Sequence, residues 1–297
     1  MDEQVQHAVW CCVYGLGIIV MLGMYGVVQE RIMSEPYGDG GEFFRIVVFL
    51  VLCNRLVAIV YALIMVWFKG ESFGNKAPLW KYIAVSMSNV AATWCQYAAL
   101  NYVSFPVQML GKSFKMMPVM LWGIVISRKE YKAIDWLVAG LVTWGVTQFL
   151  LTGPISAKHK GKESSSWGLV LLLAFLVCDG FTSTFQEKLF KEMKTSKYNQ
   201  MLYVNSASAF VSAGSLLVSG KAFVAISFCS AHPIFVSHVT ALSAAAVGGQ
   251  FFIISQVKEF GALVFAATMN VRQVVSIAVS YATYHHTITL LQILGLA

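Results

Sequence analysis

Charged residues are scarce in this chain. Only 12% of its 297 residues are Asp, Glu, Lys or Arg and 58% are hydrophobic, whereas charged residues make up about 25% of a typical soluble domain. The mean hydropathy is +0.68. Polar segments long enough to fold alone between the apolar runs are also missing. These shortages exclude an ordinary water-soluble protein and predict a polytopic protein embedded in the lipid bilayer.

Enzymatic and metal-binding signatures are missing as well. The six cysteines show no metal-site or disulfide spacing, and phosphate-loop, zinc-protease and nucleophile-elbow motifs do not occur. We therefore expect no enzyme activity and no cofactor. The net charge of +7 is mostly loop lysine, so no nucleic-acid partner is expected. The N-terminus, MDEQVQH, lacks a basic signal-peptide region, so the first helix itself should direct membrane insertion.

Apolar runs along the whole chain predict ten membrane helices, because an open sheet cannot satisfy its backbone groups in lipid. They cover residues 8–29, 44–68, 80–100, 103–127, 134–151, 166–187, 199–219, 232–256, 261–283 and 287–297. The last run has half the length needed to span, so helix ten is truncated in this chain. The predicted fold class is an all-α integral membrane protein with a single transmembrane domain over 1–297.

Basic loop residues predict the orientation in the membrane. Lys and Arg are more numerous in the loops on the N-terminal side than in those on the other side, which puts the N-terminus in the cytosol. The N-terminal side carries Lys69, Lys76, Lys81, Arg128, Lys129, Lys132, Lys188, Lys191, Lys194, Lys197 and Lys258, and the other side carries Arg31, Arg45, Lys158, Lys160, Lys162 and Lys221.

The chain repeats itself at an offset of 157 residues. The segment VQERIM (28–33) resembles FQEKLF (185–190), and the same offset carries Ser113 onto Asn270 and Lys115 onto Arg272. Each repeat, about 8–151 and about 166–297, holds five predicted helices. Because five is an odd number, the second repeat must insert upside down, which is the inverted-repeat plan with a binding site near the midplane.

The segment 103–128 is long enough to span a bilayer, yet it carries Lys112 and Lys115 at its centre. A cation there costs about 2.5–3.5 kcal/mol on insertion scales. The spacing puts both lysines on one helical face, which Gln108 extends, and Pro118 frees backbone carbonyls one turn later. Two interpretations stay open: this face binds an anionic solute, or the lysines either snorkel toward the membrane surface or pair with acids such as Asp179.

Residues 261–283 form the counterpart of this helix in the second repeat. Arg272 lies in their middle and Asn270 is close by. If the two helices face each other, Lys112, Lys115 and Arg272 surround one cavity, and such a cavity favours a ligand with several negative charges. The alternative is an internal charge network without a ligand.

Four further charged residues each have two interpretations. Arg55 either joins the cavity or pairs with Glu30. Glu30 and Glu187 end symmetric helices, either as carboxylates that hold the lysines and are displaced by the ligand, or as solvated helix ends. Asp179 either balances a lysine or takes up a proton during a reaction cycle.

Aromatic side chains beside amides occur in two predicted helices. Residues 94–97 contain Trp94, Gln96 and Tyr97, and residues 250–252 contain Gln250 followed by two phenylalanines. Stacking together with hydrogen bonds to the edge of a ring would suit a nucleobase. Ordinary helix packing is the alternative interpretation.

Several motifs together resemble the nucleotide-sugar transporter family of the drug/metabolite transporter superfamily. They are GVVQERIM (26–33), CNR (53–55), WCQYAALNYVSFPVQ (94–108), KSFKMMPVM (112–120), DGFTSTFQEKLF (179–190) and FGALVFAATMNVRQ (260–273). The likeness is strongest to carriers of adenosine 3'-phospho 5'-phosphosulfate (PAPS) and to plant-type UDP-galactose/UDP-glucose carriers. The family's basic positions match Lys112, Lys115 and Arg272, and its helix-1 acid matches Glu30.

The resemblance implies ten helices in two inverted repeats, in a Golgi or endoplasmic reticulum membrane. It also implies antiport of a cytosolic nucleotide conjugate for a lumenal nucleoside monophosphate or related nucleotide. Because PAPS carries more negative charge than a UDP-sugar, PAPS is the first substrate expected and UDP-galactose or UDP-glucose the alternative. A proton-coupled exporter of metabolites or drugs on the same fold is the competing class. For this chain we consider a homodimer as the assembly.

Overall fold

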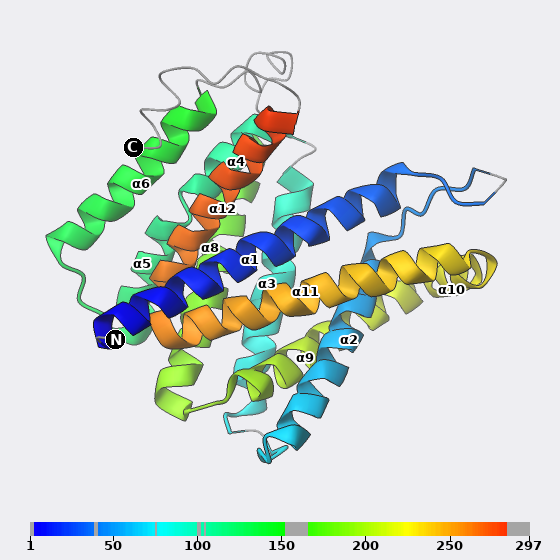
Figure 1. The fold of residues 1–297 in the computed structure, drawn as a ribbon, viewed down its shortest axis with the longest axis horizontal. Coiled ribbons are helices and arrows are strands. Elements are labelled where there is room, and N and C mark those ends of the chain that lie inside the picture. Colours follow the sequence, from blue (N-terminus) through cyan, green and yellow to red (C-terminus); the bar gives the residue numbers. More distant parts are fainter. Residues whose placement is uncertain are drawn as a thin grey trace. The chain divides into compact units, whose positions relative to one another are not determined.

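The computed structural model in Figure 1 describes residues 3–38, 41–74, 76–99, 102–103, 105–151 and 166–283. Within these residues the regular secondary structure is helical, as the sequence predicts. The helices are α1 (Glu3–Ser34), α2 (Val47–Phe68), α3 (Leu79–Ala99), α4 (Phe105–Ser113), α5 (Met116–Ser127), α6 (Ala133–Leu151), α8 (Ser166–Met193), α9 (Lys197–Val218), α10 (Lys221–Ala231), α11 (Pro233–Phe260) and α12 (Ala262–Thr283).

Five of these helices are long and apolar enough to span a membrane, and the bent pair α4–α5 brings the number to six in the described part of the chain. The five are α1, α2, α8, α9 and α11. The all-helical membrane class is therefore confirmed. The arrangement as ten helices in inverted repeats stays a prediction, and the tenth predicted span, 287–297, lies outside the described residues.

The chain divides into two compact units. Unit 1 comprises Met1–Ser86 and Met193–Gln256, and unit 2 comprises Met87–Glu192 and Val257–Ala297. Helices α3 and α11 pass from one unit into the other. Each unit therefore combines chain segments from both predicted repeats.

Small residues let helices approach closely in unit 1. Helices α1 and α11 run side by side in Figure 1, and a Cβ atom at Gly17 of α1 would lie 2.7 Å from the Phe252 ring of α11. Polar side chains join α9 to α3: the Tyr82 hydroxyl donates to Asn199 Oδ1 at 2.8 Å. Because lipid tails are as apolar as leucine, close packing and such hydrogen bonds hold membrane helices together.

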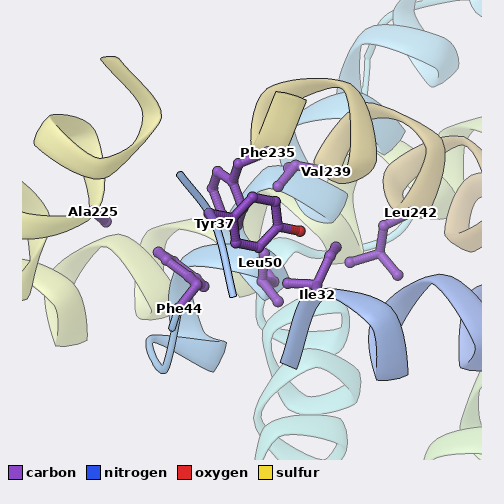
Figure 2. Packing of buried hydrophobic residues seen from close by; sticks show 8 residues of the cluster. All are labelled: Ile32, Tyr37, Phe44, Leu50, Ala225, Phe235, Val239 and Leu242. Atoms are coloured by element: carbon purple, nitrogen blue, oxygen red, sulfur yellow. The ribbon is translucent and has the colours of Figure 1, made fainter. Parts of the chain in front are cut away.

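The segment between α1 and α2 folds back onto α10 and α11. Figure 2 shows Tyr37 and Phe44 of this segment among buried apolar side chains from four helices of unit 1. Phe44 lies 4.5 Å from Phe235 between ring centroids, and Tyr37 meets the same ring edge-on at 5.3 Å. The cluster consists of Ile32, Tyr37, Phe44, Leu50, Ala225, Phe235, Val239 and Leu242.

Two predicted boundaries were wrong for physical reasons. The stretch after 219 was expected to be a loop. Residues 221–231 instead form the helix α10, whose 11 residues are too few to span a membrane. The predicted single helix 103–127 is broken into α4 and α5, which bend by 41° between their axes. This break places the central lysines and is described below.

Phe235→Ala should lower the melting temperature of the detergent-solubilised protein by several degrees. Phe235 is 0% exposed, and emptying such a site costs about 3–5 kcal/mol. The matched control is Phe223→Ala, since Phe223 is 79% exposed and should have little effect. Equal shifts for the two variants would contradict the position of this cluster in the core.

Candidate functional site

Pro118 breaks the helix that carries the two lysines. A proline lacks the N–H group and its ring clashes with the carbonyl four residues earlier, which here belongs to Phe114. The chain accordingly tightens at Phe114 and Lys115, where the Met117 N–H donates to the Phe114 carbonyl at 3.1 Å. The carbonyl of Ser113 thereby loses its usual intrahelical donor. Carbonyls are thus freed before the proline, and not one turn after it as the sequence interpretation had them.

Amide side chains of α12 satisfy the carbonyls near this break. Asn270 Nδ2 donates to the Ser113 carbonyl at 3.1 Å, and Gln273 Nε2 donates to the Met109 carbonyl at 2.8 Å. Gln108 is also buried and donates to the Gln96 carbonyl of α3 at 2.7 Å. These amides hold α3, α4 and α12 together in unit 2, and each uses its NH₂ group in doing so.

Lys115 is buried and paired. Its side chain is 9% exposed, and Nζ lies 2.7 Å from Asp179 Oδ2 of α8. The contact is an ion pair whose angles are not those of a hydrogen bond. The ammonium also lies 4.4 Å from the centroid of the Phe265 ring of α12, a cation–π arrangement. The structure thus pairs Asp179 with Lys115, and the role of Asp179 in charge balance stays a prediction.

Lys112 and Arg272 share this environment in unit 2. Lys112 is partly buried and interacts electrostatically with Arg272, Asp179 and Lys115. Arg272 Nε is buried without a hydrogen-bond partner. Among the described residues, these interactions join three cations and one carboxylate, so the basic cluster of Lys112, Lys115 and Arg272 keeps uncompensated positive charge.

Glu187 is a second carboxylate in unit 2, buried and with other partners. Lys129 Nζ donates to both of its oxygens, at 2.6 and 2.8 Å, and Lys191 Nζ lies 2.8 Å from Oε1. The Ala262 N–H, at the start of α12, donates to Oε2 at 3.0 Å. A carboxylate at a helix N-terminus satisfies free N–H groups and the helix dipole. Glu187 thus ties α12 to α8 and to the α5–α6 connection.

The charge of Glu187 also affects Tyr131 in the α5–α6 connection. Burial raises the pKa of the Tyr131 phenol to about 12, and the nearby Glu187 charge is the next cause. Glu187 therefore has its own lysine partners in this structure, and its predicted action on Lys112 and Lys115 stays a prediction.

Three of the predicted residues lie in unit 1. Arg55 of α2 donates through Nη1 to Asn205 Oδ1 at 3.0 Å, and Asn205 Nδ2 donates in turn to Gln250 Oε1 at 3.1 Å. Glu30 is exposed near the end of α1. Within the described residues, Glu30 and Arg55 form no ion pair. The structure therefore does not contain the pairing with Glu30 that was one of the two interpretations of Arg55.

Gln96 and Tyr97 of α3 were predicted to help hold a base. Gln96 is partly buried and offers its backbone carbonyl to Gln108, while Tyr97 is 47% exposed. In the part of the chain that the structure describes, neither side chain is hydrogen-bonded to the basic cluster. Their part in binding stays a prediction.

Sequence reasoning missed several partners of the site residues. Phe265 faces the Lys115 ammonium and Lys129 bonds Glu187, but neither residue carries a local signal. Asn205 could have been found, since it is an amide in the middle of an apolar helix, where polar side chains are expensive and usually bonded.

The fold and the buried charges define a class: a helical membrane protein with uncompensated cations in its interior. The chain belongs to the UAA transporter family, whose model matches residues 11–297. A PAPS transporter 1 of Dictyostelium discoideum is 46% identical, over 94% of this chain and 78% of that relative. UDP-galactose/UDP-glucose transporter 5 of Arabidopsis thaliana is 41% identical, over 99% of this chain and 86% of that relative. Human PAPS transporter 1 is 39% identical, over 96% and 66%.

The fold also occurs in a solved crystal structure. That structure superposes with a TM-score of 0.67 at 12% sequence identity, covering 96% of this chain and 92% of the other. At such low identity the likeness concerns the fold alone. The family and its relatives are transporters, which agrees with the expectation that the chain is not an enzyme.

Asp179→Asn should destabilise the protein by about 3–5 kcal/mol, because it leaves the buried Lys115 ammonium without its counter-charge. Adding Lys115→Met to this variant should restore part of the loss, which a double-mutant cycle of melting temperatures measures. Glu35→Gln is the control, since Glu35 pairs with Arg31 on the surface and such pairs contribute about 0–1 kcal/mol. The ion pair has no structural role if Asp179→Asn behaves like the control.

Gly261→Ala should destabilise by about 1–3 kcal/mol, the usual cost of a side chain in a strained backbone region. Gly261 has φ +88°, and an added Cβ would lie 3.0 Å from Glu187 Oε1. Gly214→Ala is the matched control: Gly214 lies within α9 with open space around it, so alanine should be neutral or stabilising there. A Gly261→Ala protein that melts at or above the wild-type temperature would disprove this tie.

Proposed function

We propose that the chain is a nucleotide-conjugate antiporter that carries PAPS or a UDP-sugar from the cytosol into the Golgi or endoplasmic reticulum lumen. It exchanges this substrate for a nucleoside monophosphate or a related nucleotide. The observation that supports the proposal is the basic cluster of unit 2, where Asp179 pairs with Lys115 and interacts with Lys112, while Arg272 adds a third cation beside Lys112. The surplus positive charge is a reason for the substrate to be a polyanion.

Each member of the basic cluster has a distinct capacity. Arg272 has an unbonded Nε–H and a planar fork that suits two phosphate oxygens at once. Lys112 and Lys115 act as mobile point charges. A bound phosphate would compete with Asp179 for Lys115, so that the ion pair of the empty protein holds the ammonium until substrate replaces the carboxylate. The start of α5 directly after Lys115 adds the positive end of a helix dipole.

Exchange follows from the same charges. Without ligand, three cations repel each other in an interior where water screens them poorly, and Asp179 offsets only one of them. Closing the empty site is then costly, whereas a polyanion neutralises the cluster and permits the change between inward- and outward-open states. Glu30 and Glu187, as predicted from the sequence, would serve as additional counter-charges.

The relatives support a nucleotide conjugate but divide between two substrates. One group is named for PAPS and the other for UDP-galactose and UDP-glucose. We propose PAPS first, because its additional phosphate suits the surplus of cations, and a UDP-sugar second. A thermal-shift panel of PAPS, UDP-galactose, UDP-glucose, ATP and nucleoside monophosphates separates them, since a ligand at 100 times its Kd stabilises by about 2.7 kcal/mol.

Alternating access through two inverted repeats is part of the proposal. Ser113 and Asn270 correspond under the offset of 157 residues, and they are in direct contact. Contact between equivalent residues is expected where a pseudo-two-fold axis passes, so it supports the repeat relation between α4–α5 and α12. The cytosolic N-terminus and a homodimeric assembly stay predictions from the sequence and the resemblance.

Lys112→Ala, Lys115→Ala and Arg272→Ala should each reduce exchange at least tenfold in reconstituted vesicles while the protein stays folded. Removing one partner of a buried charge contact costs about 2–5 kcal/mol of binding. Arg272→Lys should also be poor, because the two-pronged fork is lost. Lys221→Ala, at an exposed lysine, is the control. Near-normal exchange in any two of the three alanine variants would refute the basic cluster as the binding site.

Uptake of labelled substrate should require nucleotide inside the vesicles. We expect fast uptake into vesicles loaded with nucleoside monophosphate and slow uptake into empty ones, because the empty basic cluster resists closure. A pH gradient alone should not drive uptake, since Asp179 is already paired with Lys115. Uptake that a pH gradient drives into empty vesicles would favour the proton-coupled exporter instead.

A further inference from the structure

Arg55 is a partly buried cation in unit 1 that lacks a carboxylate. Its guanidinium has five N–H donors, and Nη1 donates to Asn205 Oδ1 at 3.0 Å. Nε is buried and has no hydrogen-bond partner. No Asp or Glu lies within ion-pair distance of Arg55 in the described segments. Arg55 has Asn205 as its hydrogen-bond partner and interacts electrostatically with the Tyr25 phenol. A guanidinium whose partners are neutral and whose Nε is buried is costly unless a ligand completes its bonds.

The neighbouring amides have only one consistent orientation. Asn205 faces a donor, Arg55 Nη1, on one side and an acceptor, the Met201 carbonyl, at 2.7 Å on the other. Its oxygen must therefore point to Arg55 and its NH₂ group to the carbonyl. The same NH₂ group lies 3.1 Å from Gln250, which requires the oxygen of Gln250 to face it. Gln250 then presents its NH₂ group elsewhere.

Arg55, Asn205 and Gln250 thus leave donors, and not acceptors, for a ligand. Both amide oxygens are occupied by internal donors, whereas the remaining guanidinium N–H groups and Gln250 Nε2 are donors. A group that bears only acceptors, such as a phosphate or the O4 carbonyl of uracil, can satisfy them. An exocyclic amino group would instead set donor against donor, and an unpaired buried donor costs about 1–3 kcal/mol.

Aromatic rings lie on the same three helices of unit 1. Tyr198 of α9 and Phe251 of α11 are nearly parallel, with 19° between their planes and 6.4 Å between centroids, and Tyr61 of α2 meets Phe251 edge-on at 6.4 Å. Tyr61 follows Arg55 by six residues, about 9 Å along a helix, and Phe251 is adjacent to Gln250. Planar ring faces therefore occur on the same three helices as the donors.

We propose that Arg55, Asn205 and Gln250 form a donor-only recognition site in unit 1 for an acceptor-only group of the transported nucleotide, either a phosphate or the O4 carbonyl of uracil. Arg55 contacts this group, and Asn205 and Gln250 position Arg55 and add a donor. The proposal rests on the proposed function. It assigns these residues to substrate selection.

Two pairs of nucleotides test the site. Adenosine 3',5'-bisphosphate against AMP isolates a second phosphate, and UMP against CMP exchanges the O4 acceptor for an amino donor, together with the N3–H donor for an acceptor N3. Binding to the full chain in lipid nanodiscs is measured by calorimetry. We expect wild type to prefer the first member of at least one pair by tenfold or more, and Arg55→Gln to reduce that preference to less than threefold.

The control is Arg45→Gln, at an exposed arginine, which should keep the wild-type preference. Gln250→Glu is a second variant, because it adds an acceptor beside Arg55; it should reduce the same preference even if Arg55→Gln does not fold. A preference for the bisphosphate identifies a phosphate as the group, and a preference for UMP identifies the base edge.

The two proposals fail differently. If wild type shows neither preference, or if both variants keep it, the Arg55 site is refuted while the proposed function stands, since AMP and UMP still bind through the basic cluster. If both variants weaken the binding of both members of a pair equally, the Arg55 site is also refuted. If no nucleotide binds at all, the proposed function fails and the Arg55 site fails with it.

Discussion

The ion pair between Lys115 and Asp179 is the contact on which unit 2 depends. A lone ammonium in a membrane interior is costly, and at 2.7 Å the carboxylate supplies most of its compensation. Asp179 cannot compensate Lys112 and Arg272 as well. The protein therefore keeps a surplus of positive charge where lipid and packing would select against it, and a function that needs this charge explains why it is there.

The helix break at Phe114 and Lys115 allows the ion pair between Lys115 and Asp179 to form. A continuous helix would occupy the Ser113 carbonyl with its own backbone. Because Pro118 prevents this, Asn270 bonds the carbonyl from α12 and draws Arg272, two residues further on, to the same region. The start of α12 is fixed separately by Glu187, through the Ala262 N–H. One proline and two carboxylates thus organise the helices that carry all three cations.

The buried charges were predictable from the sequence because the cost of a charge in an apolar run is a local property. Lys112, Lys115, Arg272 and Asp179 stand out in this way, and the offset of 157 residues relates Ser113 to Asn270, which are in contact. The partners were not predictable, since Phe265 beside Lys115 and Lys129 beside Glu187 depend on tertiary packing. The effect of Pro118 was anticipated, but it acts on the preceding turn. The short helix α10 was not predicted, because hydropathy identifies membrane-spanning helices but not short ones.

Nucleotide binding as a function of phosphate number tests the central claim most directly. Adenosine, AMP and ADP present one nucleoside with increasing negative charge, and calorimetry at low and high salt measures their affinities for the protein in nanodiscs. Uncompensated cations in unit 2 predict that adenosine binds weakest, that affinity rises with each phosphate, and that added salt weakens the charged ligands most. Equal affinities for adenosine and ADP, unaffected by salt, would contradict a binding site built on Lys112, Lys115 and Arg272.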